Sequence, residues 1–411
     1  MDDYSTKTAP PFLISWNLTK RCNLKCKHCY LDATELTGAE DTSTKEALLM
    51  IDKIADFAPS ALLIITGGEP LLREDLTTIT SYATEQGLVV VLGTNGTLLT
   101  LKLAKKLKAS GVRGIGISLD SVEPNFHDDF RGLTGAWLDS ITGIESTKKA
   151  GLDFQIQLTI TSKNKGEVAG IIKLAAEKEA TAVNIFFLVC TGRGQDVTDI
   201  TPSEYEEVLK SIVEAEEKYG EQMMVRARCA PHFLRVAKES APNSSLLKGE
   251  TSGCIAARGY VRISSKGILT PCPYMPAPIE SDLNLNKKSF SEIYLEDETF
   301  KKLRSPAYNG KCGDCEYSEL CGGCRARSLA TNGDLMGEDP WCDYRPKKNT
   351  KKITTNKTPI SWTPEAVSRL KKTPFFLRAM IKKGLEGYAR ATGVETITPE
   401  IMAKLRKRTG R

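Results

Sequence analysis

Short apolar runs alternate with longer amphipathic segments between residues 12 and 219. The short runs are β-branched and aliphatic and predict strands at Leu13–Leu18, Ala61–Thr66, Leu88–Leu92, Val112–Leu119, Phe154–Ile160 and Val183–Val189. The segments between them have apolar positions at helical spacing and predict helices at Ser43–Phe57, Leu72–Glu85, Leu99–Ala109, Gly135–Ala150, Lys165–Glu179 and Pro202–Tyr219. Six strand–helix units in a row indicate an α/β fold with a parallel sheet or an open barrel.

The composition is that of an ordinary globular protein. The chain has 411 residues, 40% of them apolar, which suggests two or three domains. It has no run of 18 apolar residues, and charged residues interrupt the first thirty positions, so we expect a cytoplasmic protein without a membrane span. Twelve cysteines in such a protein are better explained by metal binding than by disulfides.

Three of these cysteines, Cys22, Cys26 and Cys29, lie directly after the first predicted strand in the segment RCNLKCKHCY. In barrels built from strand–helix units, the chemistry lies on loops after the C-terminal strand ends. Structural zinc is held by four protein ligands, so a zinc site here would need a distant fourth residue. Three thiolates suit a 4Fe-4S cluster with one iron left open for a small molecule.

The loop after the second predicted strand reads ITGGEP. Gly67 and Gly68 allow close approach of a ligand to the backbone, and Glu69 places a carboxylate beside them. A strand-end turn, with Pro70 starting the next helix, is the alternative.

The cysteine motif on strand one and GGEP on strand two together resemble the signature of radical SAM enzymes, and the resemblance covers residues 12 to about 345. It implies a partial (β/α)6 TIM-like barrel in which Cys22, Cys26 and Cys29 hold the cluster. The open iron would bind S-adenosylmethionine (SAM), which an electron cleaves to methionine and a 5′-deoxyadenosyl radical. The radical would then take hydrogen from the substrate.

The same resemblance implies a set of SAM contacts. His28 would lie near the adenine, and Gly67, Gly68 and Glu69 would meet the amino group. Asn95 in TNG, and Ser118 and Asp120 in SLD, would be further SAM contacts, and Arg131 in FRG would approach the carboxylate. For the last four, a capping or turn role is the alternative.

Seven further cysteines form a block beyond the barrel: Cys254, Cys272, Cys312, Cys315, Cys321, Cys324 and Cys342. The segment CGDCEYSELCGGC could be a zinc ribbon, although such ribbons usually separate their paired ligands by a dozen or more residues. The block resembles the SPASM extension of radical SAM enzymes, which carries one or two auxiliary 4Fe-4S clusters. It departs from that pattern in having two residues rather than three between Cys321 and Cys324.

The SPASM resemblance implies two ligand sets. Cys254, Cys272 and Cys324 would hold the first auxiliary cluster, and Cys312, Cys315, Cys321 and Cys342 would hold the second. The first set lacks a fourth ligand. Cys229 in RCAPHFLRV is a candidate, and a buried apolar role for it stays open.

Several stretches, among them FFLVCTGRG and CAPHFLRV, look most like tetrapyrrole-modifying members of the group, the enzymes of haem d1 and of the alternative haem pathway. This implies loss or decarboxylation of a side chain on a carboxylated tetrapyrrole, with a reductant such as ferredoxin or flavodoxin. Arg193 would pair with substrate carboxylates, and Cys190 would face the reaction site. A loop-stabilising role for Arg193 and simple packing of Cys190 are the alternatives. No residue stands out as a general acid or base, and His127 and His232 suit structural roles.

Two rival functions stay open. A SPASM peptide or protein maturase would be expected to carry a peptide-binding segment ahead of the barrel, where this chain has about ten residues, although some maturases lack it. The other rival is a zinc-bound electron-transfer or nucleic-acid-binding protein. The net charge of +6 hides a surplus of 13 positive charges after residue 346, but no aromatic stacking platform accompanies it, so nucleic acid is not the expected partner.

We predict five segments: an N-terminal segment at 1–11, the barrel at 12–225, the SPASM extension at 226–346, a linker at 347–360 and a basic α-helical module at 361–411. Three helices in the module are predicted to begin at Thr-Pro pairs, at Thr363, Thr373 and Thr398. This pattern is similar to the C-terminal module of the light-independent protochlorophyllide reductase B subunit, an enzyme that also handles a tetrapyrrole.

Overall fold

The computed structural model describes residues 9–33, 36–38, 41–59, 61–197, 200–247, 253–275, 277, 281–347, 350–353, 360–371, 373, 381–382, 385–386, 388–389 and 394–409. Within these residues, no helix is both long enough and apolar enough to cross a membrane.

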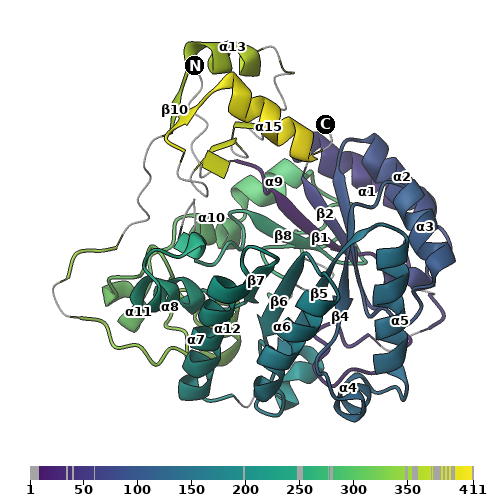
Figure 1. Cartoon of the computed structure of the whole chain (residues 1–411), viewed down its shortest axis with the longest axis horizontal. Coiled ribbons are helices and arrows are strands. Elements are labelled where there is room, and N and C mark those ends of the chain that lie inside the picture. The colour runs from purple at the N-terminus through teal and green to yellow at the C-terminus, as the bar shows by residue number, and fades with distance from the viewer. Residues whose placement is uncertain are drawn as a thin grey trace.

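One nine-stranded sheet organises the chain (Figure 1). Its strand order is β7-β6-β5-β4-β3-β2-β1-β8-β9, and every neighbouring pair is parallel except β8 and β9. The strands are β1 (Leu13–Asn17), β2 (Leu62–Thr66), β3 (Val89–Thr94), β4 (Gly114–Ser118), β5 (Asp153–Ile160), β6 (Ala182–Phe187), β7 (Met224–Arg228), β8 (Tyr260–Ile263) and β9 (Leu269–Thr270). The sheet does not close, so the predicted partial barrel is confirmed.

Helices follow the strands and lie outside the sheet (Figure 1). In the barrel they are α1 (Thr44–Phe57), α2 (Leu76–Glu85), α3 (Leu101–Ala109), α4 (Pro124–Arg131), α5 (Ala136–Lys149), α6 (Val168–Glu177) and α7 (Pro202–Tyr219). Helix α2 begins four residues later than predicted, because Pro70–Leu72 forms a separate 3-10 turn that Glu69 caps through the Leu71 amide. The sequence pattern did not predict α4 or the edge strand β7.

The cysteine-rich part of the chain extends this sheet. Strand β8 pairs in parallel with β1, on the side opposite to β2. Its helices are α8 (His232–Ser240), α9 (Phe290–Glu296), α10 (Glu298–Arg304), α11 (Gly310–Asp314) and α12 (Arg325–Asn332). The rings of Phe57 in α1 and Phe290 in α9 stack 4.8 Å apart, so barrel and extension share one core. Strand β7 crosses residues 225 and 226, and the barrel boundary predicted there therefore falls inside a strand.

The C-terminal module has a small core of its own, formed by Ala366, Leu385, Ala389 and Ile397. Two short parallel strands, β10 (Ser361–Trp362) and β11 (Thr396–Ile397), lie beside α13 (Pro364–Lys371) and α15 (Pro399–Thr409). The helices predicted at Thr363 and Thr398 are confirmed. The one predicted from Thr373 lies mostly outside the described residues.

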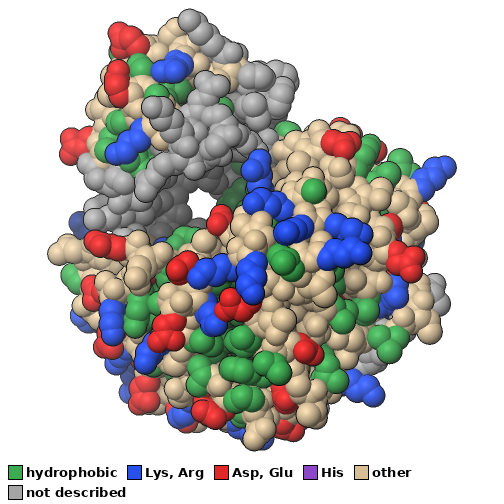
Figure 2. Space-filling view, turned by 45° about the vertical axis from the view of Figure 1, so that its right-hand side comes forward, with side chains coloured by type: hydrophobic (Ala, Val, Ile, Leu, Met, Phe, Trp, Pro, Cys, Tyr) green, Lys and Arg blue, Asp and Glu red, His purple; other side chains and the backbone are tan. Residues whose placement is uncertain are grey.

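On the barrel face seen in Figure 2, Lys and Arg side chains are interspersed with Asp and Glu.

Candidate active site

The loop after β1 places three cysteines at the C-terminal end of the parallel sheet. Cys22 and Cys26 are buried, with 9% and 8% of their surface exposed, and Cys29 is half-buried. The Leu24 amide donates to the Cys22 sulfur at 3.4 Å. Burial, with a smaller contribution from the neighbouring Cys26, raises the pKa of the Cys22 thiol to about 12 against the opposing effect of the Leu24 hydrogen bond. A positively charged metal group would offset this cost by binding the thiolate form.

The GGEP segment fixes the start of this loop by backbone contacts. The Gly68 amide donates to the Thr19 carbonyl at 2.8 Å, and the Glu69 amide donates to the Arg21 carbonyl at 2.6 Å. A Cβ atom on Gly67 would lie 2.4 Å from the Thr19 carbonyl oxygen, and one on Gly68 would lie 2.2 Å from that of Arg21. Both glycines are therefore required for the close approach of two backbone segments, whatever ligand binds beside them.

The Glu69 carboxylate is fully buried at the end of β2. It accepts hydrogen bonds from the Thr94 hydroxyl at 2.7 Å and from the Leu71 and Asn95 amides at 3.0 and 2.8 Å. Burial outweighs these bonds and raises the pKa of Glu69 to about 7. An ammonium group beside it would favour the charged form, which fits the amino group of a SAM ligand.

Asp120 and Arg131 form a buried ion pair beside the cysteine loop. Arg131 Nε donates to Asp120 Oδ2 at 2.5 Å, and its Nη1 reaches the Cys26 sulfur at 3.8 Å. Burial alone would raise the pKa of Asp120, but Arg131 holds it below its usual value. Asp120 and Arg131, both predicted SAM contacts, therefore bind each other, and Arg131 also contacts Cys26. The Asp120 amide also donates to His127 Nδ1 at 3.2 Å, a structural role for that histidine.

The His28 ring stacks on Phe130, with ring centroids 4.4 Å apart. Its Nδ1 atom is buried and has no hydrogen-bond partner among the described residues. Burial and then the charge of Arg131 lower the pKa of His28 to about 3, so the ring is neutral. A neutral aromatic ring with an unused polar atom fits the predicted position beside an adenine.

Asn95 follows β3 and binds the cysteine loop. Its side-chain amide donates to Asn23 Oδ1 at 2.9 Å, and its oxygen accepts from the Thr97 amide at 2.9 Å. Asn23 lies between Cys22 and Cys26 and was not among the predicted site residues. Ser118 is the last residue of β4 and is half-buried.

Arg193 also binds the cysteine loop, from the segment after β6. Its Nε donates to the Cys26 carbonyl at 2.9 Å, and its Nη1 pairs with Asp32 at 2.5 Å. Its backbone amide donates to the Cys29 carbonyl at 3.1 Å. These contacts match the loop-stabilising alternative rather than a contact with substrate carboxylates. Cys190 lies in the same segment and is half-buried.

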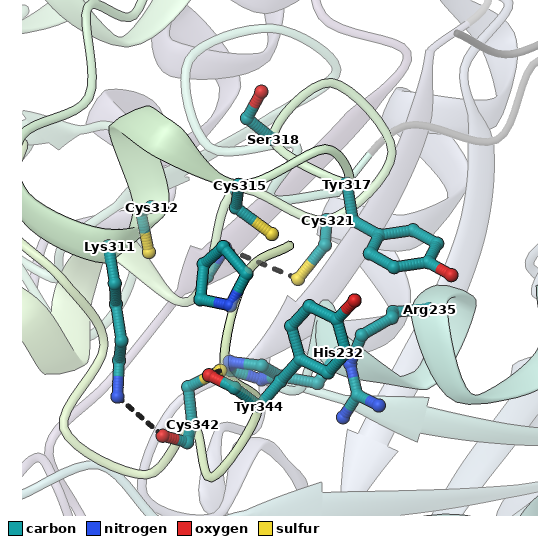
Figure 3. Close-up of a pocket in the computed structure, with 13 residues that line it drawn as sticks. His232, Arg235, Lys311, Cys312, Cys315, Tyr317, Ser318, Cys321, Cys342 and Tyr344 are labelled. Atoms are coloured by element: carbon teal, nitrogen blue, oxygen red, sulfur yellow. Dashed lines mark hydrogen bonds between the residues drawn. The ribbon is translucent and has the colours of Figure 1, made fainter. Parts of the chain in front are cut away.

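All four cysteines predicted for the second auxiliary cluster line one cavity (Figure 3). Arg325 Nη2 lies 3.9 Å from the Cys312 sulfur, and Lys311 donates to the Cys342 carbonyl at 2.6 Å. The remaining lining comes from His232, Arg235, Tyr317, Ser318, Gly322, Gly323, Tyr344 and Pro346. No three His, Cys, Asp or Glu side chains in the described ranges converge on the position of a single metal ion. Cluster cysteines each bind a different iron, so a four-iron group requires no such convergence.

The four cysteines of the first predicted set also lie together. Burial raises the pKa of Cys272, and the nearby thiols of Cys229, Cys254 and Cys324 raise it further. The pKa of Cys229 is raised by burial, and the thiols of Cys324 and Cys254 act in the same direction. Cys229 has a backbone φ of +56°, a conformation that non-glycine residues seldom adopt and that is often found at functional sites.

The buried ion pair of Arg327 and Asp339 contacts the backbone of two of these cysteines, Cys229 and Cys324. Arg327 donates to Asp339 Oδ2 at 2.8 Å and to the Cys229 carbonyl at 2.8 Å. Asp339 in turn accepts from the Cys324 amide at 2.7 Å. One network therefore connects Cys229 to Cys324 and fits a shared role for the two. The pKa of nearby His232 is lowered to about 4, chiefly by burial, which fits a structural histidine.

A three-cysteine loop at the C-terminal end of a partial barrel, with two further cysteine groups beyond it, defines the radical SAM enzymes that carry auxiliary clusters. Residues 16–175 match the radical SAM superfamily, residues 254–316 match the SPASM iron-sulfur cluster-binding domain, and residues 362–406 match the proto-chlorophyllide reductase 57 kD subunit. The chain belongs to the radical SAM superfamily and is an enzyme. Its cofactors are SAM, a 4Fe-4S cluster with three cysteine ligands, and auxiliary 4Fe-4S cluster binding of the SPASM domain.

Among particular relatives, the AdoMet-dependent heme synthase of Methanosarcina barkeri is 40% identical over 83% of this chain and 99% of the relative. The Fe-coproporphyrin III synthase of the same organism is 30% identical over 80% and 87% of the two chains. The mycofactocin maturase MftC of Mycolicibacterium smegmatis is also 30% identical, over 81% and 82%. The solved structure of Streptococcus suis SuiB with S-adenosylmethionine has a similar fold, with a TM-score of 0.66, 17% identity, and 82% and 78% of the chains covered.

Proposed function

We propose that this enzyme removes or decarboxylates a side chain of a carboxylated tetrapyrrole on the way to a haem-type product. The observation that carries the proposal is the 40% identity to a heme synthase that is matched over 99% of its length. The 30% identity to an Fe-coproporphyrin III synthase supports the same class of substrate.

Each cofactor has a set of residues that fits it. Cys22, Cys26 and Cys29 would hold the SAM cluster, while Glu69 and His28 would face the amino group and the adenine of SAM. The proposed auxiliary sets are Cys229, Cys254, Cys272 and Cys324 for the first cluster, and Cys312, Cys315, Cys321 and Cys342 for the second. When bound, these groups supply the electron that cleaves SAM and an acceptor for the electron that the substrate releases.

The protein's own residues position and shield this chemistry. Arg193, Asn95 and the GGEP backbone fix the cysteine loop, and the Asp120–Arg131 pair lies directly behind it. Loss of a hydrogen atom beside a propionate leaves a substrate radical. Its conversion to a vinyl group releases carbon dioxide and one electron, so an electron acceptor is required near the substrate.

We further propose a ferredoxin or flavodoxin as the reductant and the cytoplasm as the location, since free thiols for cluster binding need a reducing compartment. The predicted segments (1–11, 12–225, 226–346, 347–360 and 361–411) are retained as the proposed domain organisation, with the end of the barrel moved to the end of β7 at Arg228. The matched residues, 16–175, 254–316 and 362–406, fall inside three of them.

The test uses protein purified and reconstituted without oxygen, then given SAM and dithionite with and without Fe-coproporphyrin III. We expect 5′-deoxyadenosine to form, its yield to rise with the porphyrin, and the porphyrin to lose carbon dioxide, as measured by mass spectrometry. If SAM is cleaved and the porphyrin is recovered unchanged, the tetrapyrrole proposal is wrong.

A peptide or protein maturase is the second candidate, because a mycofactocin maturase is 30% identical over 81% of the chain. The lower identity makes it the weaker of the two. SAM cleavage that is stimulated by a peptide and not by a porphyrin would favour it.

A further inference from the structure

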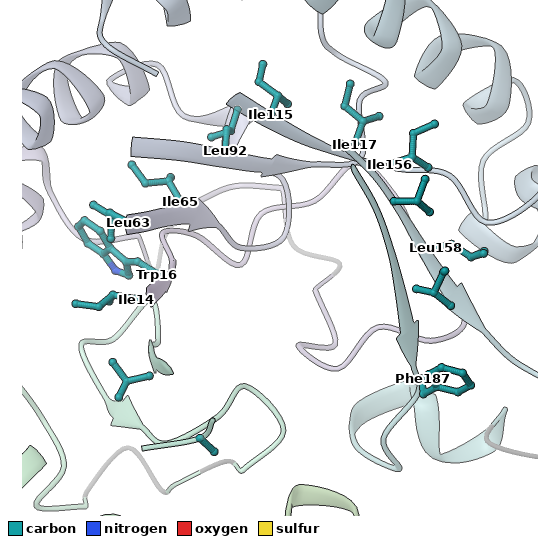
Figure 4. Packing of buried hydrophobic residues seen from close by; sticks show 14 of the residues in the cluster. Ile14, Trp16, Leu63, Ile65, Leu92, Ile115, Ile117, Ile156, Leu158 and Phe187 are labelled. Atoms are coloured by element: carbon teal, nitrogen blue, oxygen red, sulfur yellow. The ribbon is translucent and has the colours of Figure 1, made fainter. Parts of the chain in front are cut away.

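Two arginines on the inner face of the sheet have no carboxylate partner among the residues that the structure describes. The outer face of the strands packs against the helices through residues such as Ile14, Trp16 and Phe187 (Figure 4). Side chains alternate between the two faces of a strand, so the neighbouring positions point inward. Arg262 on β8 and Arg228 at the end of β7 belong to this inner set, because each bonds an inward-facing asparagine.

Arg262 lies among polar and aromatic groups near the cysteine loop. It is 9% exposed, and its Nε donates to Asn17 Oδ1. Asn17 in turn donates to the Tyr30 hydroxyl at 2.9 Å, and Tyr30 directly follows Cys29. Burial lowers the pKa of Arg262, while Tyr30, Tyr260 and Cys272 are the groups close enough to act against that shift.

Arg228 is the last residue of β7, the strand at the edge of the sheet opposite to β8 and β9, and it directly precedes Cys229. Its Nε donates to Asn184 Oδ1 at 2.7 Å. The side chain is exposed to solvent, yet surrounding protein atoms and Arg226 lower its pKa. The Arg228 guanidinium is therefore open to a ligand that approaches the end of β7.

Neither arginine forms an ion pair with any carboxylate in the described part of the chain. Several buried arginines there do form such pairs: Arg131 with Asp120, Arg235 with Glu206, and Arg327 with Asp339. Buried Arg325 has no carboxylate partner among the described residues either, but it donates to the carbonyls of Gly323, Leu335 and Gly337. Among the described residues, Arg228 and Arg262 each donate to a single asparagine oxygen, which leaves guanidinium donors available for an anionic ligand.

The two arginines border one region. Tyr260 on β8 and Ser15 on β1 share a 2.5 Å hydrogen bond on this inner face, and Tyr274 lies two residues after Cys272. Arg228 adjoins Cys229, and Arg262 lies near Tyr30 and Cys272. The Tyr30 and Tyr274 rings are 5.2 Å apart, which adds aromatic surface suited to a flat conjugated molecule.

We propose that Arg228 and Arg262 bind side-chain carboxylates of the substrate and hold its macrocycle between the Cys22–Cys29 loop and the first auxiliary cysteines. This inference rests on the proposed function and names residues that recognise the substrate. It replaces Arg193, whose guanidinium binds the cysteine loop, as the origin of carboxylate recognition.

The test measures equilibrium binding of Fe-coproporphyrin III, by its visible absorption, to reconstituted wild type and to Arg228→Gln and Arg262→Gln. The matched control is Arg113→Gln, since Arg113 is exposed and precedes β4 at the end of the sheet away from the cysteine loop. A second probe is the same porphyrin with its propionates esterified. Iron content and SAM binding are measured on every variant.

We expect each inner-face variant to raise the Kd of the acid porphyrin about 10- to 100-fold, the loss typical of a charge-assisted hydrogen bond. The Kd of the ester and the behaviour of Arg113→Gln should not change. Unchanged binding of the acid porphyrin by both variants would overturn the inference while leaving the proposed function intact.

A wild-type protein that binds no porphyrin would refute the proposed substrate and the arginine assignment together. If a Gln variant loads less iron, Arg228→Lys and Arg262→Lys replace it. They keep the charge and lose the planar two-pronged geometry, so we expect their binding to be intermediate. Wild-type affinity in the fully loaded lysine variants would contradict the assignment.

Discussion

Arg193 donates a hydrogen bond from Nε to the main-chain carbonyl of Cys26 at 2.9 Å, across a sequence separation of 167 residues. With its Nη1 on Asp32, this one side chain connects the segment after β6 to the cysteine loop after β1. The loop is thus held from the far side of the barrel as well as from the neighbouring strands.

Replacing this residue should weaken the loop that we propose to hold the SAM cluster. We expect Arg193→Gln to lose iron to a chelator several-fold faster than wild type, because the charge-assisted bond to the Cys26 carbonyl, worth about 1.5–3 kcal/mol, is removed. The exposed pair with Asp32 adds little to this effect. The control is Lys27→Gln, which breaks an exposed ion pair with Asp129 on the same loop and should have little effect. Equal rates of iron loss in wild type and Arg193→Gln would contradict the clamp.

Gly68→Ala should prevent the two backbone segments from meeting. Its Cβ would lie 2.2 Å from the Arg21 carbonyl oxygen, and backbone cannot move aside as a flexible side chain can. We expect a loss of roughly 2–4 kcal/mol in the free energy of unfolding, measured by urea titration. Gly166→Ala is the matched control, since no atom lies within 4 Å of the added carbon, and it should change stability by less than about 0.5 kcal/mol.

Glu69 should make the SAM-free protein less stable as pH rises. Burial raises its pKa from 4.5 to about 7, so the folded state binds a proton that the unfolded state has released. The stabilisation is complete below about pH 4.5 and is lost as pH approaches 7, a difference of about 3 kcal/mol. Urea unfolding of wild type and Glu69→Gln across this range measures it.

The pH dependence of stability must be compared between wild type and Glu69→Gln. In both proteins the pKa values of His127 and His232 are lowered to about 4, and these two histidines make the protein more stable as pH rises. Glu69→Gln should remove the falling component. An identical pH dependence in both proteins would show that Glu69 is not the source.

Cys229→Ser tests the fourth ligand of the first auxiliary cluster. With three clusters we expect about twelve iron atoms per chain in wild type and about eight in the variant. Cys190→Ser, a half-buried cysteine outside both sets, should keep the wild-type iron content. Full iron and unchanged spectra in Cys229→Ser would assign that cysteine to packing.

Truncation should locate the functional end of the SPASM extension. Lys352 donates to the Cys315 carbonyl at 3.1 Å, and the Ile353 amide donates to the Glu316 carbonyl at 2.6 Å. A chain ending at Ile353 should therefore keep its iron, whereas one ending at Pro346 should lose iron from the second auxiliary site. Equal iron contents in the two truncated proteins would show that these contacts are dispensable.

Much of the barrel could be predicted because its signals are local. All six strands were placed within about two residues, since β-branched runs between helical periods are read from neighbouring positions. The cysteine spacings likewise indicated candidate metal sites. Strand β8 could not be predicted, because its pairing with β1 depends on residues more than 200 positions away.

The same limit applies to the site. Arg193, Arg228 and Arg262 are equivalent in the sequence as single basic residues near strands. Only the fold shows that the first contacts the cysteine loop and that the other two have no carboxylate partner among the described residues. The position of Cys229 beside Cys254, Cys272 and Cys324 also depends on long-range packing.

The turn at Gly322 and Gly323 has a consequence for electron movement. Both glycines have positive φ values, 64° and 65°, and they separate Cys321 from Cys324. In the proposed assignment these two cysteines bind different clusters. A covalent bridge of four consecutive residues therefore joins the two auxiliary centres, and an electron released by the substrate can pass from one to the other without leaving the protein interior.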